Sequence, residues 1–168
     1  MDRLLIWLVV VAALAALCLV RPNVGRLVVG CFFIAMALGV HGAILLVDPQ
    51  SYVTFAGGAY LPLYRDVAVR VVTANPVLFG LAVAAFELAV ALLVLQKGRA
   101  VTLGLAGMAL FLVGIVPLGV EEAPCLLLAA ALAHLATKRF DASFAELVRA
   151  RLHRRRSLVA AAVAPTLR

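Results

Sequence analysis

The sequence predicts an all-α protein, a bundle of helices that lies in a membrane. Three observations support this fold class: the apolar composition, the length of the apolar runs and the uneven placement of the basic residues. Hydrophobic residues make up 66% of the 168 residues, and the mean hydropathy is +1.15. A water-soluble domain needs more polar surface than this composition provides. The apolar surface is therefore expected to face lipid, so the bilayer is the first predicted partner.

Five apolar runs approach the length of about 20 residues that a helix needs to cross a hydrocarbon core of about 30 Å. We expect spans at residues 4–20, 27–47, 77–95, 101–116 and 118–136. The first run could also be a signal-peptide core, because Asp2 and Arg3 precede it and small residues lie within it. Its length argues against cleavage, as does Leu17 before Cys18, where a lipid-attachment site needs a small residue. The spans form a transmembrane domain over residues 1–139.

The basic residues predict how these helices are oriented. With five crossings, twelve of the fifteen Lys and Arg residues fall on one side, at Arg21, Arg26, Lys97, Arg99 and in the segment after residue 137. The other side has Arg3, Arg65 and Arg70. Because cytoplasmic loops are enriched in Lys and Arg, we expect a multi-pass protein of the prokaryotic plasma (inner) membrane, with its N-terminus outside and its C-terminus in the cytoplasm. The net charge of +7 thus indicates membrane orientation and no nucleic-acid partner.

Two connections are predicted on the outer side. Prolines, Glu121 and Glu122 interrupt the apolar sequence before the fifth span, which predicts a hairpin with both carboxylates in solvent, or alternatively a cation or partner site. The longest connection, 48–76, has aromatic residues that suit the headgroup zone, at Tyr52, Phe55, Tyr60 and Tyr64. Residues 64–73 within it predict a short interfacial helix.

The segment 140–168 predicts a basic amphipathic tail on the cytoplasmic side. Ser143 and Glu146 match a capping box, and apolar residues recur at helical spacing at Phe140, Phe144, Leu147, Val148 and Leu152. The opposite face is basic, and we expect contact with anionic lipid, at about 1 kcal/mol for each side chain, from Arg149, Arg151, Arg154, Arg155 and Arg156. Contact of the same side chains with a partner protein is the alternative.

Two ionisable residues inside the predicted spans are the candidate proton-handling pair. Glu87 lies near the middle of the third span and His41 lies in the second, and charged groups at such positions are costly and often functional. Small residues that let helices approach recur at helical spacing, at Gly80, Ala84 and Ala91 around Glu87 and at Ala35, Gly39 and Ala43 in the second span. We expect Glu87 to face the bundle interior near His41, with Asp48 continuing a polar path outward. A buried polar pair that only orients helices is the alternative.

Other chemistry has little support in the sequence. Cys18, Cys31 and Cys125 form no C-x-x-C motif and predict apolar packing. His, Cys and Glu are not spaced as metal ligands, so no metal site is predicted. His134 is expected to be an interfacial side chain. No cofactor motif is encoded, and a quinone held between helices is the one cofactor that remains possible.

The order of several short motifs resembles the DoxX-like family of small four-helix membrane proteins. These motifs are Arg26-Leu27-Val28-Val29-Gly30, His41-Gly42, Asp48-Pro49, Phe86-Glu87-Leu88 and Gly98-Arg99. The resemblance covers about residues 24–136 and implies a four-helix core to which the first helix and the basic tail are additions. It also implies a role for Glu87 and His41. Members are associated with thiosulfate:quinone oxidoreduction and thiol systems, and related four-helix proteins act as assembly factors. The chain departs from the family at Ile44-Leu45-Leu46, where a lysine is common, and at Val90-Ala91, where a glycine pair is common.

Two functions follow as predictions. The first is an accessory or assembly subunit of a larger membrane complex, which docks a membrane protein partner or further copies of itself. The second is a DoxX-like component of a quinone-linked redox system, with Glu87 and His41 as proton-handling groups. A small transporter is a third prediction, and the sequence leaves open whether the protein is an enzyme.

Overall fold

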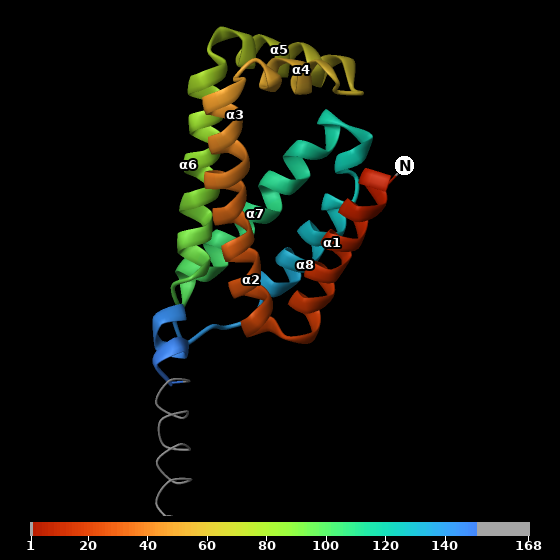
Figure 1. The fold of residues 1–168 in the computed structure, drawn as a ribbon. Helices are drawn as coiled ribbons and strands as arrows, with labels where there is room; N and C mark the ends of the chain where they lie inside the picture. Colours follow the sequence, from red (N-terminus) through yellow and green to blue (C-terminus); the bar gives the residue numbers. More distant parts are fainter. Residues whose placement is uncertain (1, 151–168) are drawn as a thin grey trace, which may run out of the picture.

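The computed structural model describes residues 2–150, and in that range all regular structure is helical (Figure 1). The elements in chain order are α1 (Asp2–Val20), α2 (Pro22–Ala35), the π-turn η1 (Met36–His41), α3 (Gly42–Val47), α4 (Ser51–Gly57), α5 (Pro62–Ala74), α6 (Pro76–Val94), α7 (Arg99–Ile115), the 3-10 turns η2 (Val116–Leu118) and η3 (Val120–Glu122), and α8 (Cys125–Ala136). A further short helix follows at 144–150. The predicted all-α class is therefore confirmed.

Three helices are long and apolar enough to cross a membrane: Pro22–Val47, which joins α2, η1 and α3, then α6, and Arg99–Leu118, which joins α7 and η2. The apolar part of α1 is shorter, at Leu4–Val20. The expected start of the fifth span near residue 118 is wrong. The α8 helix begins at Cys125 and has 12 residues, or about 18 Å. Prolines at 117 and 124 explain the difference, because proline lacks the N–H that a continuous helix needs.

The long helices pack as a closed ring. In chain order around it, α1 packs on α2 and α8, α8 on α7, α7 on α6, and α6 on α2. The short helices α4 and α5 lie across one end, roughly perpendicular to α6 (Figure 1). We call this end, with α4, α5 and η3, the arm end. The opposite end, with the α1–α2 turn, the α6–α7 turn and the segment after α8, is the basic end.

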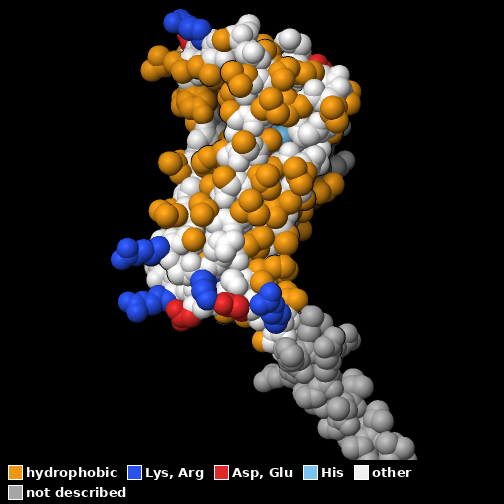
Figure 2. Space-filling model, turned by 90° about the vertical axis from the view of Figure 1, so that its left-hand side faces the viewer, with side chains coloured by type: hydrophobic (Ala, Val, Ile, Leu, Met, Phe, Trp, Pro, Cys, Tyr) orange, Lys and Arg blue, Asp and Glu red, His pale blue; other side chains and the backbone are white. Residues whose placement is uncertain are grey.

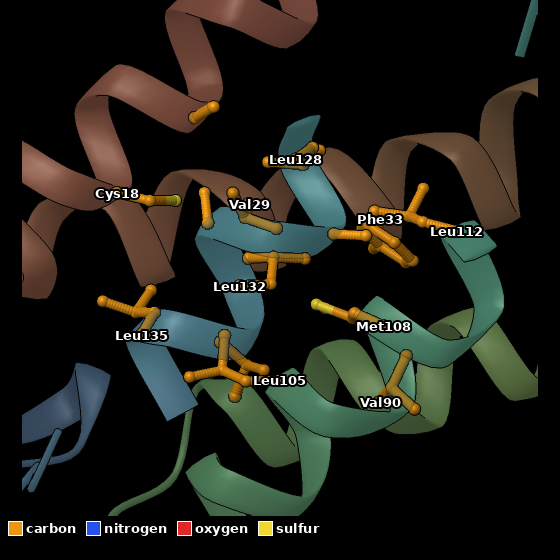
Figure 3. Packing of buried hydrophobic residues seen from close by; sticks show 14 of the residues in the cluster. Cys18, Val29, Phe33, Val90, Leu105, Met108, Leu112, Leu128, Leu132 and Leu135 are labelled. Carbon is orange, nitrogen blue, oxygen red and sulfur yellow. The ribbon is translucent and has the colours of Figure 1, made fainter. Parts of the chain in front are cut away.

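The α8 helix provides the centre of the hydrophobic core (Figure 3). Leu128, Leu132 and Leu135 recur at helical spacing and are at most 1% exposed. They lie in one buried cluster with side chains from the other ring helices, among them Cys18, Val29, Phe33, Val90, Leu105 and Met108. In lipid, such packing holds helices together mainly through van der Waals contact and close backbone approach. Gly104 provides that approach, because a Cβ there would lie 2.7 Å from the Val90 carbonyl oxygen on α6.

One arginine joins three chain segments at the basic end. Arg26 has no exposed surface, and its guanidinium lies 4.6 Å from the centre of the Phe140 ring. It donates hydrogen bonds to the carbonyl oxygens of Gln96, at 3.0 Å, and Ala142. The sequence predicted that these three basic segments share one side, and these contacts confirm that they share one end. Figure 2 shows Lys and Arg side chains gathered mostly at this end, with hydrophobic side chains covering the long face.

The predicted capping box of the tail is confirmed. The Ser143 N–H donates to Glu146 Oε2 at 2.7 Å, and the Glu146 N–H donates to Ser143 Oγ at 3.3 Å. Phe140 does not lie on the helix as expected. It precedes the helix and is 4% exposed, because it packs under Arg26. Arg149 is exposed at the end of the described range, whereas Leu152, Arg151, Arg154, Arg155 and Arg156 lie outside the described residues.

Candidate proton-handling site

Glu87 faces the interior of the bundle, as predicted. The α6 helix starts at Pro76 after Asn75, whose side chain accepts a hydrogen bond from the Leu78 N–H at 2.9 Å. From this start, α6 turns Gly80, Glu87 and Ala91 toward its neighbours. Glu87 is only 2% exposed and Ala91 is fully buried. The predicted small-residue face of this helix is therefore confirmed.

His41 lies on the inward face of the second span. Along α2 and η1 the buried residues Val29, Phe33 and Ala37 recur every four residues. His41, the last residue of the π-turn η1, follows Ala37 by four and continues the same stripe. The expected contact face in this span is wrong, since Ala35, Gly39 and Ala43 are all exposed.

The structure brings His41 and Glu87 together. His41 Nε2 lies 3.4 Å from Glu87 Oε2, and the exposed fractions of the two side chains are 15% and 3%. The distance is that of an ion pair, but its angles are not those of a hydrogen bond: Glu87 Oε2 accepts none from the described residues. A buried carboxylate oxygen in this state is costly. Glu87 Oε2 can therefore bind a proton or accept a hydrogen bond from a further donor.

Tyr52 of α4 is the second partner of His41. The Tyr52 hydroxyl lies 2.8 Å from His41 Nδ1, and the two rings are stacked with centres 5.8 Å apart and an angle of 11°. Burial, together with the charge of Glu87, raises the pKa of the Tyr52 phenol above 10.0. The phenol is therefore a donor at neutral pH. We assign Nδ1 of neutral His41 as the acceptor, which places the ring hydrogen on Nε2, facing Glu87.

The sequence did not predict this role for Tyr52. It placed Tyr52 in the headgroup zone and Asp48 on the path from His41 outward, whereas Tyr52 is 6% exposed. Asp48 accepts hydrogen bonds from the Ser51 hydroxyl at 2.7 Å and from the Gln50 N–H at 3.2 Å. Asp48 therefore stabilises the turn that begins α4. The helix α4 itself was not predicted, although α5 confirms the short helix expected at 64–73.

The His41–Glu87 pair lies on the wall of a cavity of about 350 Å³ between the helices. Side chains from α1, α2, α4, α6, α7 and η3 line it, and most are apolar: Leu4, Trp7, Phe32, Phe33, Met36, Phe55, Phe111, Leu112 and Ile115. Successive aromatic rings pack with centres 6.2–6.3 Å apart, in the order Trp7, Phe32, Phe33 and Phe111. Leu4, Phe55 and Glu121 are exposed, so the cavity opens toward the arm end. This apolar space with a few polar groups is typical of small-molecule sites.

Two further carboxylates, from the 3-10 turn η3, line this cavity. Glu121 is exposed, as predicted, but Glu122 is half-buried and accepts a contact of 3.4 Å from the Cys125 thiol. Burial raises the pKa of Glu122, and the neighbouring Glu121 adds to the effect. The expectation that both carboxylates lie in a solvated turn is therefore wrong for Glu122. In the sequence, the one sign of this cavity was the pair of acids in a proline-rich break of the apolar run. The sequence did not show that the fold turns this break inward.

The remaining candidate groups are dispersed. Cys18 and Cys125 are buried in the core, as predicted for packing, whereas Cys31 is exposed. His134 is exposed near the end of α8. Within residues 2–150, no cluster of three or more His, Cys, Asp or Glu side chains could hold a metal ion. The only grouping of polar side chains around a cavity that we find there is the one at Glu87.

Comparisons with protein-family models, with known proteins and with solved structures gave no match. The resemblance to DoxX-like proteins therefore stays a prediction.

Proposed function

We propose that this chain is an integral membrane protein whose cavity binds a lipid-soluble small molecule, and that Glu87 and His41 exchange a proton at that site. The observation that carries the proposal is the buried Glu87 carboxylate on the wall of an aromatic cavity, with one oxygen that accepts no hydrogen bond from the described residues. Buried ionisable groups inside membrane proteins commonly belong to proton or substrate pathways.

We further propose a five-crossing topology in a prokaryotic plasma membrane, with the basic end in the cytoplasm. The gathering of Arg26, Lys97 and the segment after α8 at one end supports this orientation. The 3-10 turns before α8 would extend its path through the outer interface, since α8 alone is shorter than the hydrocarbon core. The arm helices α4 and α5 would lie at the outer surface.

A proton path follows from the hydrogen-bond order. A proton passes from His41 Nε2 to Glu87 Oε2 over the 3.4 Å contact as the Tyr52 hydroxyl gives its proton to Nδ1 over 2.8 Å. Because the two transfers occur together, His41 is neutral before and after them and changes only the nitrogen that carries its hydrogen. The Tyr52 phenolate then takes a proton from water at the arm end.

A quinone is one molecule that such a site could hold. The Trp7 indole lines the cavity, and a quinone ring would pack against it and the neighbouring aromatic rings. Reduction to the quinol would take two electrons from a partner protein and two protons, of which Glu87 would supply one. A role as accessory or assembly subunit remains a second candidate. It is favoured by exposed apolar side chains on several helices, such as Leu46, Leu63 and Leu110.

The test uses the full chain purified in a mild non-ionic detergent. Native mass spectrometry should detect a small molecule bound to the wild-type protein, and its identity would separate a quinone from other ligands. Glu87→Gln should lose the molecule, whereas Asp66→Asn on the exposed side of α5 should retain it. A wild-type protein that carries no molecule, and binds none added to it, would contradict the proposal. Stoichiometric recovery with a larger membrane complex would favour the subunit role.

A further inference from the structure

The charges of the cavity are unbalanced. Three carboxylates line it, Glu87 in the wall and Glu121 and Glu122 nearer the opening, and the only basic side chain in the lining is His41. With His41 neutral and bonded to Tyr52, the described lining carries no permanent positive charge. A neutral or anionic ligand would leave these carboxylates uncompensated in an apolar environment, which is unfavourable.

The aromatic walls add a second, independent preference. Trp7, Phe32, Phe33, Phe55 and Phe111 line the same space, and the negative faces of such rings attract organic cations most strongly where water is excluded. Glu87 Oε2, buried and without a hydrogen-bond partner in the described range, is the acceptor for a cationic centre. An apolar cation would therefore satisfy both the rings and the carboxylates.

We propose that the ligand of this cavity is a lipophilic organic cation, an amine or quaternary ammonium compound with apolar substituents. This inference rests on the proposed function, because it names the class of molecule that the same cavity binds. The cation enters from the arm end past Glu121 and Glu122, and it binds beside Glu87 among the aromatic rings. The bound cation pairs with the Glu87 carboxylate, whose Oε2 accepts no hydrogen bond from the described residues.

Two probes of the same shape and opposite charge provide the test: tetraphenylphosphonium and tetraphenylborate. Trp7 is the one tryptophan of the chain, so its fluorescence reports binding in the cavity of the full-length protein in non-ionic detergent. We expect saturable binding of tetraphenylphosphonium with a dissociation constant at least about tenfold below that of tetraphenylborate.

Matched variants locate the charge recognition. Glu87→Gln should weaken tetraphenylphosphonium binding about tenfold or more, and the joint change Glu121→Gln and Glu122→Gln should weaken it less. Asp66→Asn should leave it unchanged. Equal binding of the two probes, or an unchanged affinity in Glu87→Gln, overturns the inference. If a neutral quinone alters the Trp7 fluorescence and the cation does not, the inference fails while the proposed function stands. If no lipid-soluble probe binds, both fail.

Discussion

His41 Nε2 lies 3.4 Å from Glu87 Oε2, because His41 continues the inward stripe of Phe33 and Ala37, which recur every four residues. Tyr52, which packs against the backbone at Gly80, contacts the other nitrogen of the imidazole. His41 is also the last residue of a π-turn, and short π segments often mark functional sites in helices.

The His41–Glu87 pair predicts a coupling between two substitutions. His41→Gln removes the partner and leaves Glu87 buried and uncompensated, so it should lower stability. The double variant with Glu87→Gln should be less destabilised than the sum of the two single variants, with a coupling of about 0.5–3 kcal/mol. Unfolding in mixed detergent measures it. Strictly additive effects would show that the two side chains do not interact.

Gly80 predicts a steric test of Tyr52. A Cβ at this position would lie 2.5 Å from Tyr52 Cε2 and 2.8 Å from Leu45 Cδ2. Gly80→Ala should push the ring away from His41 and destabilise the protein by about 1–3 kcal/mol. Gly39→Ala is the matched control, because nothing lies within 4 Å of its added Cβ. A thermal unfolding midpoint that falls equally in both variants would argue against this packing.

Arg26 predicts that one side chain holds the basic end together. Arg26→Gln leaves the Gln96 and Ala142 carbonyls without this donor and removes the contact with Phe140. The loss of a buried charged donor should cost about 3 kcal/mol or more. In the wild-type protein the Gly98 N–H donates to the Phe140 carbonyl at 2.8 Å. In the variant, hydrogen exchange at this amide should become faster. Arg21→Gln, at an exposed position in the same turn, should leave this exchange rate unchanged.

Glu146 predicts an acid-sensitive contact of the tail. Lys97 Nζ, 2.6 Å from Glu146 Oε1, lowers the pKa of this carboxyl from 4.5 to about 2, with help from the Ser143 N–H. A lowered pKa means that the contact stabilises fully above pH 4.5 and is lost as pH falls toward 2. Exchange of the Glu146 and Phe144 amides should therefore accelerate over that range. Glu146→Gln should show the faster rate already at neutral pH, and Asp141→Asn should behave as the wild type.

Much of the fold could be predicted, because apolar length and basic asymmetry are properties of residue order. The buried faces of α6 and the Ser143–Glu146 capping box followed from helical spacing alone. The end of the fourth span near residue 116 was also predicted closely, but the start of α8 was not, because prolines at 117 and 124 break the apolar run without removing its hydropathy. A proline break of this kind alters the path of the backbone but hardly alters the mean hydropathy of the segment, so a hydropathy pattern does not show it.

The site was predicted in part for a related reason. Glu87 and His41 were identified because ionisable groups are rare in apolar spans. Their burial was expected because contact of such groups with lipid is costly. Tyr52 was not identified, because an aromatic residue that follows a helix break can lie at a surface as easily as in a core. The choice of inward face in the second span failed because small residues also recur every four residues on its exposed face, at Ala35, Gly39 and Ala43. Arg26 was counted as a topology signal, and its burial depends on contacts from distant segments.

The most direct test of the central claim is the reaction of Glu87 with dicyclohexylcarbodiimide, a lipid-soluble reagent that adds to protonated carboxyl groups. If Glu87 is a proton-exchanging group reached through the apolar cavity, peptide mass spectrometry of the treated full-length protein should find the N-acylurea adduct at Glu87. The yield should fall when tetraphenylphosphonium fills the cavity, and the adduct should be absent in Glu87→Gln. Labelling confined to exposed carboxylates such as Asp66, with Glu87 unmodified, would contradict the account.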